Sequence, residues 1–168
     1  MATDNAIEKA LKSACLEVSV ELKDHQRSSI EAVLKRKDVF VTLPTGYGKS
    51  MIFHLLPLCS RHLGQSESPL VIVVAPLLSL MEDQIGRISE TPGLGRAIQL
   101  TGGLPDKGEL DKASFIFTSP EALLSQNECR KLFMKDEFVA RIIAVVVDEA
   151  HCIAKWYIGH ISWHTYMY

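Results

Sequence analysis

Four short apolar runs end directly in clusters of polar residues, and this feature limits the possible folds more than any other part of the sequence. The runs cover residues 39–43, 70–75, 115–117 and 142–147. Strands that are apolar at every position are typical of a parallel sheet covered by helices on both faces. Stretches with helical periodicity separate the runs. The sequence therefore predicts an α/β fold, with a mostly parallel sheet, helices on both faces and right-handed crossovers.

Helical periodicity and capping residues predict six helices around this sheet. The first is capped by Asp4 and carries Ile7, Leu11, Ala14 and Val18 at helical spacing, and the others cover residues 24–36, 49–59, 76–89, 121–125 and 128–135. A weaker strand is predicted at residues 97–100. The glycines from 93 to 108 predict one long surface connection.

Composition and charge agree with one globular domain. The 168 residues are 47% hydrophobic and 23% charged, which excludes a collagen, a coiled coil or a disordered tail. The net charge of −2 means that any contact with nucleic acid must be local. The N-terminus does not resemble a signal peptide, no apolar run reaches the roughly 18 residues of a membrane helix, and the four cysteines form no C-x-x-C pair. We therefore expect an intracellular protein with free thiols, in the cytoplasm, or in the nucleus of a eukaryote.

Residues 45–50 read Thr-Gly-Tyr-Gly-Lys-Ser, the pattern of a phosphate-binding loop. Glycines allow the backbone to turn its N–H groups around an anion, and the start of the following helix adds positive charge. Lys49 is expected to reach the β- and γ-phosphates, and Ser50 to hold Mg²⁺. Leu43 stands where the strict pattern has its first glycine, which argues against GTPases and many kinases. The residues of this loop that we expect to bind the nucleotide are Thr45, Gly46, Gly48, Lys49 and Ser50.

Asp148 and Glu149 follow the longest apolar run. Two carboxylates there are costly unless a cation compensates their charge, and a metal–nucleotide complex would do so. Asp148 is the candidate Mg²⁺ ligand, and Glu149 is the candidate base that orients and deprotonates the attacking water. An acidic helix cap is the alternative interpretation. Because ligands of parallel sheets bind at the carboxyl edge of the strands, this pair and the phosphate loop are predicted to lie together.

Three blocks, at residues 44–50, 76–84 and 148–156, resemble the RecQ-like DNA helicases of superfamily two, which carry a DEAH box. The resemblance covers residues 22–156 and implies the first of the two RecA-like lobes of such an enzyme, with a P-loop NTPase fold. It further implies ATP and Mg²⁺ as cofactors, single-stranded or forked DNA as partner, and 3′-to-5′ unwinding in DNA repair or recombination. Residues 1–21 are expected to be a separate helical segment.

The resemblance also implies roles for individual residues near the nucleotide. Gln26 is expected to read adenine, because an amide can pair with both the N6 donor and the N7 acceptor. Lys23 stands where the family has arginine, and Leu22 where it has an aromatic residue. These two departures predict looser recognition of the base.

Further residues are implied in DNA binding and in its coupling to hydrolysis. Ser79, Thr118 and Ser119 are expected to contact the DNA backbone, since hydroxyls and helix starts suit phosphates, with ordinary helix caps as the alternative. His151 is expected to relay between the nucleotide and the DNA-sensing segment, with a plain buried histidine as the alternative. Trp156 begins that segment and is a candidate DNA contact.

After Trp156 the chain departs from the family pattern, because residues 157–168 are rich in aromatic residues and contain no Asp, Glu, Lys or Arg. This change indicates a truncated product or an alternative reading of the gene, and a DNA-stacking segment is the alternative. Cys152, His160 and His164 make a weak zinc pattern without paired spacing. The second lobe, which supplies an arginine to the γ-phosphate in the family, is expected to be missing. We therefore expect slow ATP hydrolysis at best, and no unwinding by this chain alone.

Three other functions stay open on the sequence. A non-catalytic nucleotide- or DNA-binding fragment would use the same residues, and an RNA helicase of the same superfamily would share most motifs. An unrelated P-loop kinase or transporter ATPase is disfavoured by Leu43 and by residues 148–151. The basic run at residues 35–37 is interpreted as a solvated helix end rather than a nuclear import signal.

Overall fold

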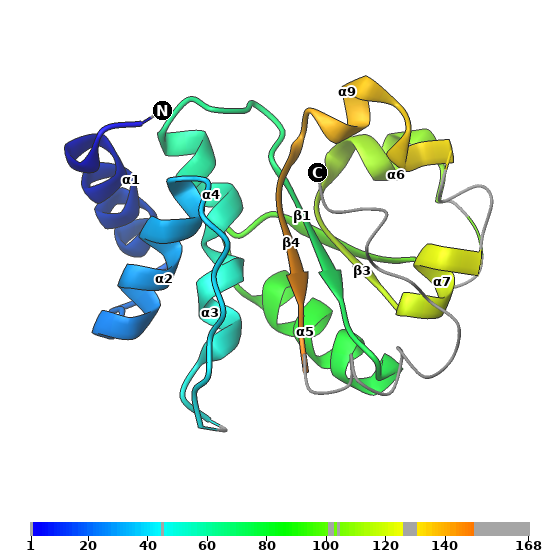
Figure 1. Cartoon of the computed structure of the whole chain (residues 1–168), viewed down its shortest axis with the longest axis horizontal. Helices are drawn as coiled ribbons and strands as arrows, with labels where there is room; N and C mark the ends of the chain where they lie inside the picture. The colour runs from blue at the N-terminus through cyan, green and yellow to red at the C-terminus, as the bar shows by residue number, and fades with distance from the viewer. Residues whose placement is uncertain (1, 45, 101–102, 104, 126–130, 150–168) are drawn as a thin grey trace.

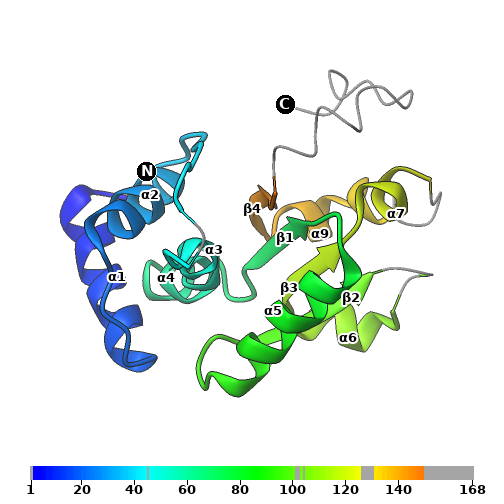
Figure 2. The same ribbon diagram turned by 90° about the horizontal axis from the view of Figure 1, so that it is seen from below.

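A parallel sheet of four strands organises the computed structural model of this protein, which describes residues 2–44, 46–100, 103, 105–125 and 131–149. The strands are β1 (Leu70–Val74), β2 (Arg96–Leu100), β3 (Ala113–Thr118) and β4 (Ile142–Val147). Their order in the sheet is β2-β3-β1-β4, and all three pairings are parallel. Figure 1 labels β1, β3 and β4, and Figure 2 also labels β2. The predicted α/β class with a mostly parallel sheet is confirmed, including the weaker strand that became β2.

Helices cover both faces of the sheet (Figure 2). Helices α3, α4 and α5 lie on one face, with α1 and α2 packed outside α3 and α4, and helices α6, α7 and α9 lie on the other face. Their bounds are Asp4–Glu17 for α1, Asp24–Leu34 for α2, Lys49–His54 for α3, Leu56–His62 for α4, Leu78–Glu90 for α5, Lys107–Lys112 for α6, Pro120–Ser125 for α7 and Asp136–Val139 for α9. Among the described residues, no helix is long and apolar enough to cross a membrane.

The side chains of β1 explain why its sequence is apolar at every position. Val71 and Val73 lie in the core between the sheet and α1 to α5, whereas Leu70, Ile72 and Val74 lie in the core on the opposite face. All five are buried. Since full burial of one such side chain contributes about 1.5–3 kcal/mol, both cores favour this strand in the centre of the sheet.

The prediction of a strand at residues 39–43 is wrong, because this segment pairs with no strand in the described structure. Val41 and Leu43 pack against the core next to α1 to α5, but Phe40 is 85% exposed. Strand β4 is one of the two edge strands of the described sheet, and its Val145 is 60% exposed. The segment therefore has strand-like side chains, but it lacks the neighbouring backbone that a strand needs for its hydrogen bonds.

Smaller differences concern helix ends and one missed helix. Thr3, not Asp4, caps α1, since the Thr3 hydroxyl accepts from the backbone N–H of Ala6 at 3.3 Å. The predicted helix at 49–59 is divided at Leu55 into α3 and α4. Helix α6 interrupts the predicted surface connection, and Asp106 caps it by accepting from the N–H of Glu109 at 2.9 Å. Part of the helix predicted at 128–135 lies outside the described residues.

Candidate nucleotide site at the carboxyl edge of the sheet

The carboxyl ends of three strands stand in line across the sheet. Val74 of β1 pairs in register with Thr118 of β3 on one side and with Val147 of β4 on the other. The backbone continues this alignment beyond the strands, since Ala75 N–H donates to Thr118 O at 3.0 Å and Asp148 N–H to Val74 O at 2.9 Å. The polar residues that follow β1, β3 and β4 therefore emerge at one edge.

The phosphate loop has the backbone that its glycines predict. Gly46 and Gly48 have φ angles of 79° and 82°, in the left-handed region where a side chain would be strained. The ammonium of Lys49 donates to two main-chain carbonyls of the preceding segment, Leu43 O at 3.0 Å and Pro44 O at 3.4 Å. A Cβ built on Gly46 would meet no atom within 4 Å, so the backbone there is open to a ligand.

Gln26 joins the start of α2 to the phosphate loop. Its Oε1 accepts from Lys23 N–H at 2.9 Å, and its Nε2 donates to Gly48 O at 2.9 Å and to Tyr47 O at 3.4 Å. A Cβ at Gly48 would lie 2.7 Å from this Nε2, so only glycine fits there without a shift. Gln26 is 5% exposed, and both ends of its amide are already hydrogen bonded. Reading a base would require this amide to exchange partners.

The acidic pair lies at the end of β4, within electrostatic range of the phosphate loop. Burial raises the pKa of Asp148, and the charge of Glu149 raises it further, whereas the Glu149 N–H and the charge of Lys49 lower the pKa. That N–H donates to Asp148 Oδ1 at 2.9 Å, and Glu149 adopts a left-handed φ of 54°. Such backbone strain in a non-glycine residue often marks a functional position.

The donor set at this edge fits a magnesium–nucleotide complex by its chemistry. A partly buried carboxylate whose pKa is raised by burial gains from a nearby cation. Hard divalent cations prefer carboxylate and hydroxyl oxygens, which Asp148 and Ser50 can provide. The lysine and the glycine-rich backbone at residues 46–49 suit phosphate. The described residues contain no group of three or more His, Cys, Asp or Glu placed to hold a metal by themselves.

The three predicted DNA contacts of this edge differ in accessibility. Ser79 is exposed in the first turn of α5. Ser119 accepts from the N–H of Ala122 at 3.1 Å, so its hydroxyl acts as a helix cap. Thr118 is fully buried and donates to Leu100 O at 3.1 Å. Its hydroxyl therefore faces β2 rather than the surface, and a DNA contact of Thr118 stays a prediction.

Several predicted residues lie outside the described part of the chain. They are Thr45 of the phosphate loop, the relay candidate His151, the DNA-contact candidate Trp156, and the zinc candidates Cys152, His160 and His164.

Two features of this edge were not predicted from the sequence. Leu77 and Leu78 are each 54% exposed at the start of α5, although they belong to an apolar sequence. Tyr47 holds the ammonium of Lys23 over its ring, 3.9 Å from the ring centre. The sequence did contain one signal for the contact between Tyr47 and Lys23, namely an aromatic residue between the two glycines of a phosphate loop.

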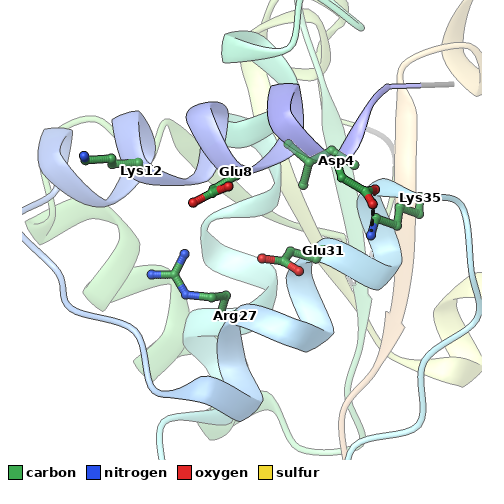
Figure 3. A pocket seen from close by; sticks show the side chains of 7 residues that line it. Asp4, Glu8, Lys12, Arg27, Glu31 and Lys35 are labelled. Carbon is green, nitrogen blue, oxygen red and sulfur yellow. Dashed lines mark ion pairs between the residues drawn. The ribbon is translucent and has the colours of Figure 1, made fainter.

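A hollow of about 530 Å³ lies between α1 and α2 (Figure 3). Asp4, Glu8 and Glu31 line it together with Lys12, Arg27 and Lys35, and Asp4 pairs with Lys35 at 2.9 Å. Its acidic and basic side chains balance in number. This hollow therefore lacks the single sign of charge that would attract phosphate or nucleic acid.

Comparison with known proteins identifies the family. The family model described as DEAD/DEAH box helicase matches residues 23–166. The chain belongs to the DEAD/DEAH box helicase family. This membership confirms the resemblance to helicases that the three motif blocks indicated, and proteins named as the ATP-dependent DNA helicases RecS and RecQ are among the relatives.

Two curated relatives and one solved structure illustrate the similarity. The probable ATP-dependent DNA helicase RecS of Bacillus subtilis is 37% identical over 144 residues, which are 82% of this chain and 26% of RecS. The ATP-dependent DNA helicase RecQ of Synechocystis is 31% identical over 137 residues, 78% of this chain and 27% of that protein. The crystal structure of the DUF1998 helicase MrfA bound to DNA and AMPPNP matches with a TM-score of 0.65 and 21% identity, over 90% of this chain and 22% of MrfA. The last similarity concerns the fold alone and agrees with a RecA-like α/β fold.

The chain spans only a small part of its relatives. It covers between 10% and 27% of the length of eight curated relatives, RecS and RecQ among them.

Proposed function

We propose that residues 22–156 form the ATP-binding lobe of a DNA helicase that moves 3′-to-5′ and couples ATP hydrolysis to unwinding. The observation that carries this proposal is the closeness of the phosphate loop to the acidic pair at the carboxyl end of β4, where the charge of Lys49 lowers the pKa of Asp148. The names of the relatives, which are ATP-dependent DNA helicases, favour DNA over RNA as the partner. An enzyme acting on DNA would work in the cytoplasm, or in the nucleus of a eukaryote.

The residues of the phosphate loop would bind and orient the triphosphate. Lys49 would leave the carbonyls of Leu43 and Pro44 and donate to the β- and γ-phosphates, which offer it negative charge in place of neutral acceptors. The backbone N–H groups around Gly46 and Gly48 would surround the phosphate oxygens. Thr45 completes this loop in the proposal.

The acidic pair and Ser50 would provide the remaining chemistry. Ser50 and Asp148 would hold Mg²⁺, which when bound neutralises negative charge on the phosphate oxygens. Glu149 would orient the attacking water and accept its proton. Gln26 would exchange its contacts with the loop carbonyls for the edge of adenine, so base binding and loop position would be linked. Ser79, Ser119 and Trp156 are the proposed DNA contacts, and His151 is the proposed relay.

Substitution of Lys49 tests the nucleotide site directly. We expect Lys49→Ala to weaken Mg–ATP binding at least tenfold, because a charge-assisted hydrogen bond to phosphate contributes about 1.5–3 kcal/mol. Binding is measured by calorimetry on the full chain, and ATP turnover is measured with and without single-stranded DNA or RNA.

Lys12→Ala is the matched control, because Lys12 lines the hollow between α1 and α2 and takes no part in the proposed site. The proposal is wrong if Lys49→Ala and Lys12→Ala bind Mg–ATP equally well. Stimulation of turnover by RNA but not by DNA would contradict the choice of DNA.

A further inference from the structure

An aromatic side chain of the phosphate loop lies against the start of α2. Tyr47 stands between the two left-handed glycines, Gly46 and Gly48. The ammonium of Lys23 lies 3.9 Å from the centre of its ring, close enough for a cation–π interaction. The ring of His25 is tilted by 50° to it, with 6.5 Å between the two ring centres. The phenol ring therefore has a defined position, although it belongs to a loop.

This ring lines an open hollow of about 540 Å³ beside the phosphate loop. The residues around the hollow are Glu21, Leu22, Lys23, Asp24, His25 and Tyr47. Leu22 is only 9% exposed, so it contributes little accessible apolar surface. Tyr47 and His25 are thus the lining residues that can offer a ring face to a planar ligand.

The hollow also adjoins the polar groups that could read a base. Lys23 lines it, and the same lysine donates its backbone N–H to the Oε1 of Gln26. The Nε2 of Gln26 in turn bonds to the carbonyls of Tyr47 and Gly48. A flat heterocycle in the hollow would displace the Lys23 ammonium from the Tyr47 ring to stack there. Gln26 would reach the edge of that heterocycle by exchanging its present partners.

We propose that Tyr47 is the stacking platform for the nucleobase and determines how strongly the site prefers a nucleoside phosphate over phosphate alone. The inference rests on the proposed nucleotide site. In this arrangement the phosphate loop supplies the ring, whereas Leu22, just before α2, is buried. Tyr47 contributes to the affinity for the base, whereas Lys49 contributes to the affinity for the phosphates.

Two ligands separate these contributions in a calorimetric experiment on the full chain. ADP carries a base, and inorganic tripolyphosphate does not. Stacking of a base on an aromatic side chain contributes enough affinity that its loss by alanine substitution is readily measured. We expect Tyr47→Ala to weaken ADP binding about tenfold and to change tripolyphosphate binding less than twofold. Tyr47→Phe keeps the ring and should bind ADP within twofold of the wild type.

The other possible results would overturn either the stacking proposal or the nucleotide site itself. Equal weakening of ADP and tripolyphosphate by Tyr47→Ala would mean that the substitution disturbs the loop, and it would overturn the proposal. Unchanged ADP binding by Tyr47→Ala would overturn it as well. If the wild type binds neither ligand, or if Lys49→Ala binds tripolyphosphate as the wild type does, the nucleotide site itself is wrong and the platform fails with it. Equal unfolding temperatures of the wild type, Tyr47→Ala and Tyr47→Phe would show that a folding defect does not cause the change in ADP affinity.

Discussion

At the scale of single residues, His54 shows how burial fixes a protonation state. This histidine is only 4% exposed and lies at the end of α3, next to the rings of Phe53 and Phe115. Burial lowers its pKa to about 4, although the interaction with Gln84 raises it and the charge of Arg87 lowers it by less. The folded protein therefore holds His54 neutral at pH 7.

This shift predicts a loss of stability in weak acid. The unfolded chain protonates His54 near its ordinary pKa of 6.5, whereas the folded chain does so only near 4. Between these values the unfolded state binds more protons, so stability is complete above pH 6.5 and falls as the pH falls toward 4. We expect about 2 kcal/mol of the free energy of unfolding to be lost from this group between pH 7 and pH 5.

The matched variant is His54→Gln, which is polar and does not titrate. Urea unfolding of both proteins at pH 7, 6 and 5 gives the difference that belongs to His54, because the other titrating groups are common to both. The unfolding free energy of His54→Gln should fall less steeply with decreasing pH. If the unfolding free energies of the two proteins fell equally with decreasing pH, His54 would not be the cause of the acid-induced loss of stability.

The residue scale also shows what the sequence could specify at the candidate site. The spacing of residues 45–50 and of Asp148 and Glu149 was enough to name the phosphate loop and the acidic pair. It could not reveal that Gln26 already bonds to Tyr47 and Gly48, because these contacts join segments more than twenty residues apart. It also could not show that Thr118 is buried, since a threonine at a strand end can face either the core or the solvent.

At the scale of elements, continuous apolar runs predicted the strands that have neighbours. Runs 70–75, 115–117 and 142–147 became β1, β3 and β4, because each meets at least one parallel partner. Run 39–43 has the same composition but no strand beside it in the described structure, and β-forming residues alone do not make a strand. Helix α6 was missed because its glycine and charged residues resemble a surface loop.

The exposed edge strand β4 predicts a tendency to associate. An edge strand with free backbone groups and an apolar side chain facing solvent is a template for another chain, and Val145 is 60% exposed there. We expect Val145→Thr to slow aggregation on concentration without loss of stability. Light scattering over time at several protein concentrations measures the first effect, and thermal unfolding measures the second.

Val71→Thr provides the matched control for this substitution. It makes the same change in β1, at a fully buried position. The buried hydroxyl should cost about 1–3 kcal/mol of stability. Two results would count against the edge assignment: equal destabilisation by both substitutions, or aggregation of Val145→Thr at the wild-type rate.

At the scale of the whole molecule, the parallel sheet gathers distant polar residues at one edge. The rule that ligands of open parallel sheets bind at the carboxyl ends of the strands was sufficient to predict this gathering for β1, β3 and β4. The strand order β2-β3-β1-β4 was beyond sequence reasoning, because the connections fix only which strands follow one another. The same limit explains why the position of segment 39–43 relative to the sheet could not be predicted.

The charge of the whole molecule predicts how the proposed DNA binding responds to salt. The protein has a net charge of −2, and acidic residues lie near the proposed contacts: Glu82 and Asp83 on α5, and Glu121 at the start of α7. Arg87 is already paired with Asp83 at 3.0 Å. DNA bound at this edge would therefore face few cations, and hydroxyls and backbone groups would release few counterions.

We therefore expect a shallow dependence of DNA affinity on salt. For single-stranded DNA, log K falls with log salt by about 0.7 for each phosphate neutralised by lysine or arginine. One or two such contacts give a slope of about −1, measured by fluorescence anisotropy with a labelled oligothymidine between 50 and 200 mM NaCl. Glu82→Lys should tighten binding and steepen the slope by about 0.7, because it adds one cation beside Ser79. A wild-type slope of about −4 or steeper would instead mean that a basic surface binds the DNA, and the contacts proposed at this edge would then be wrong.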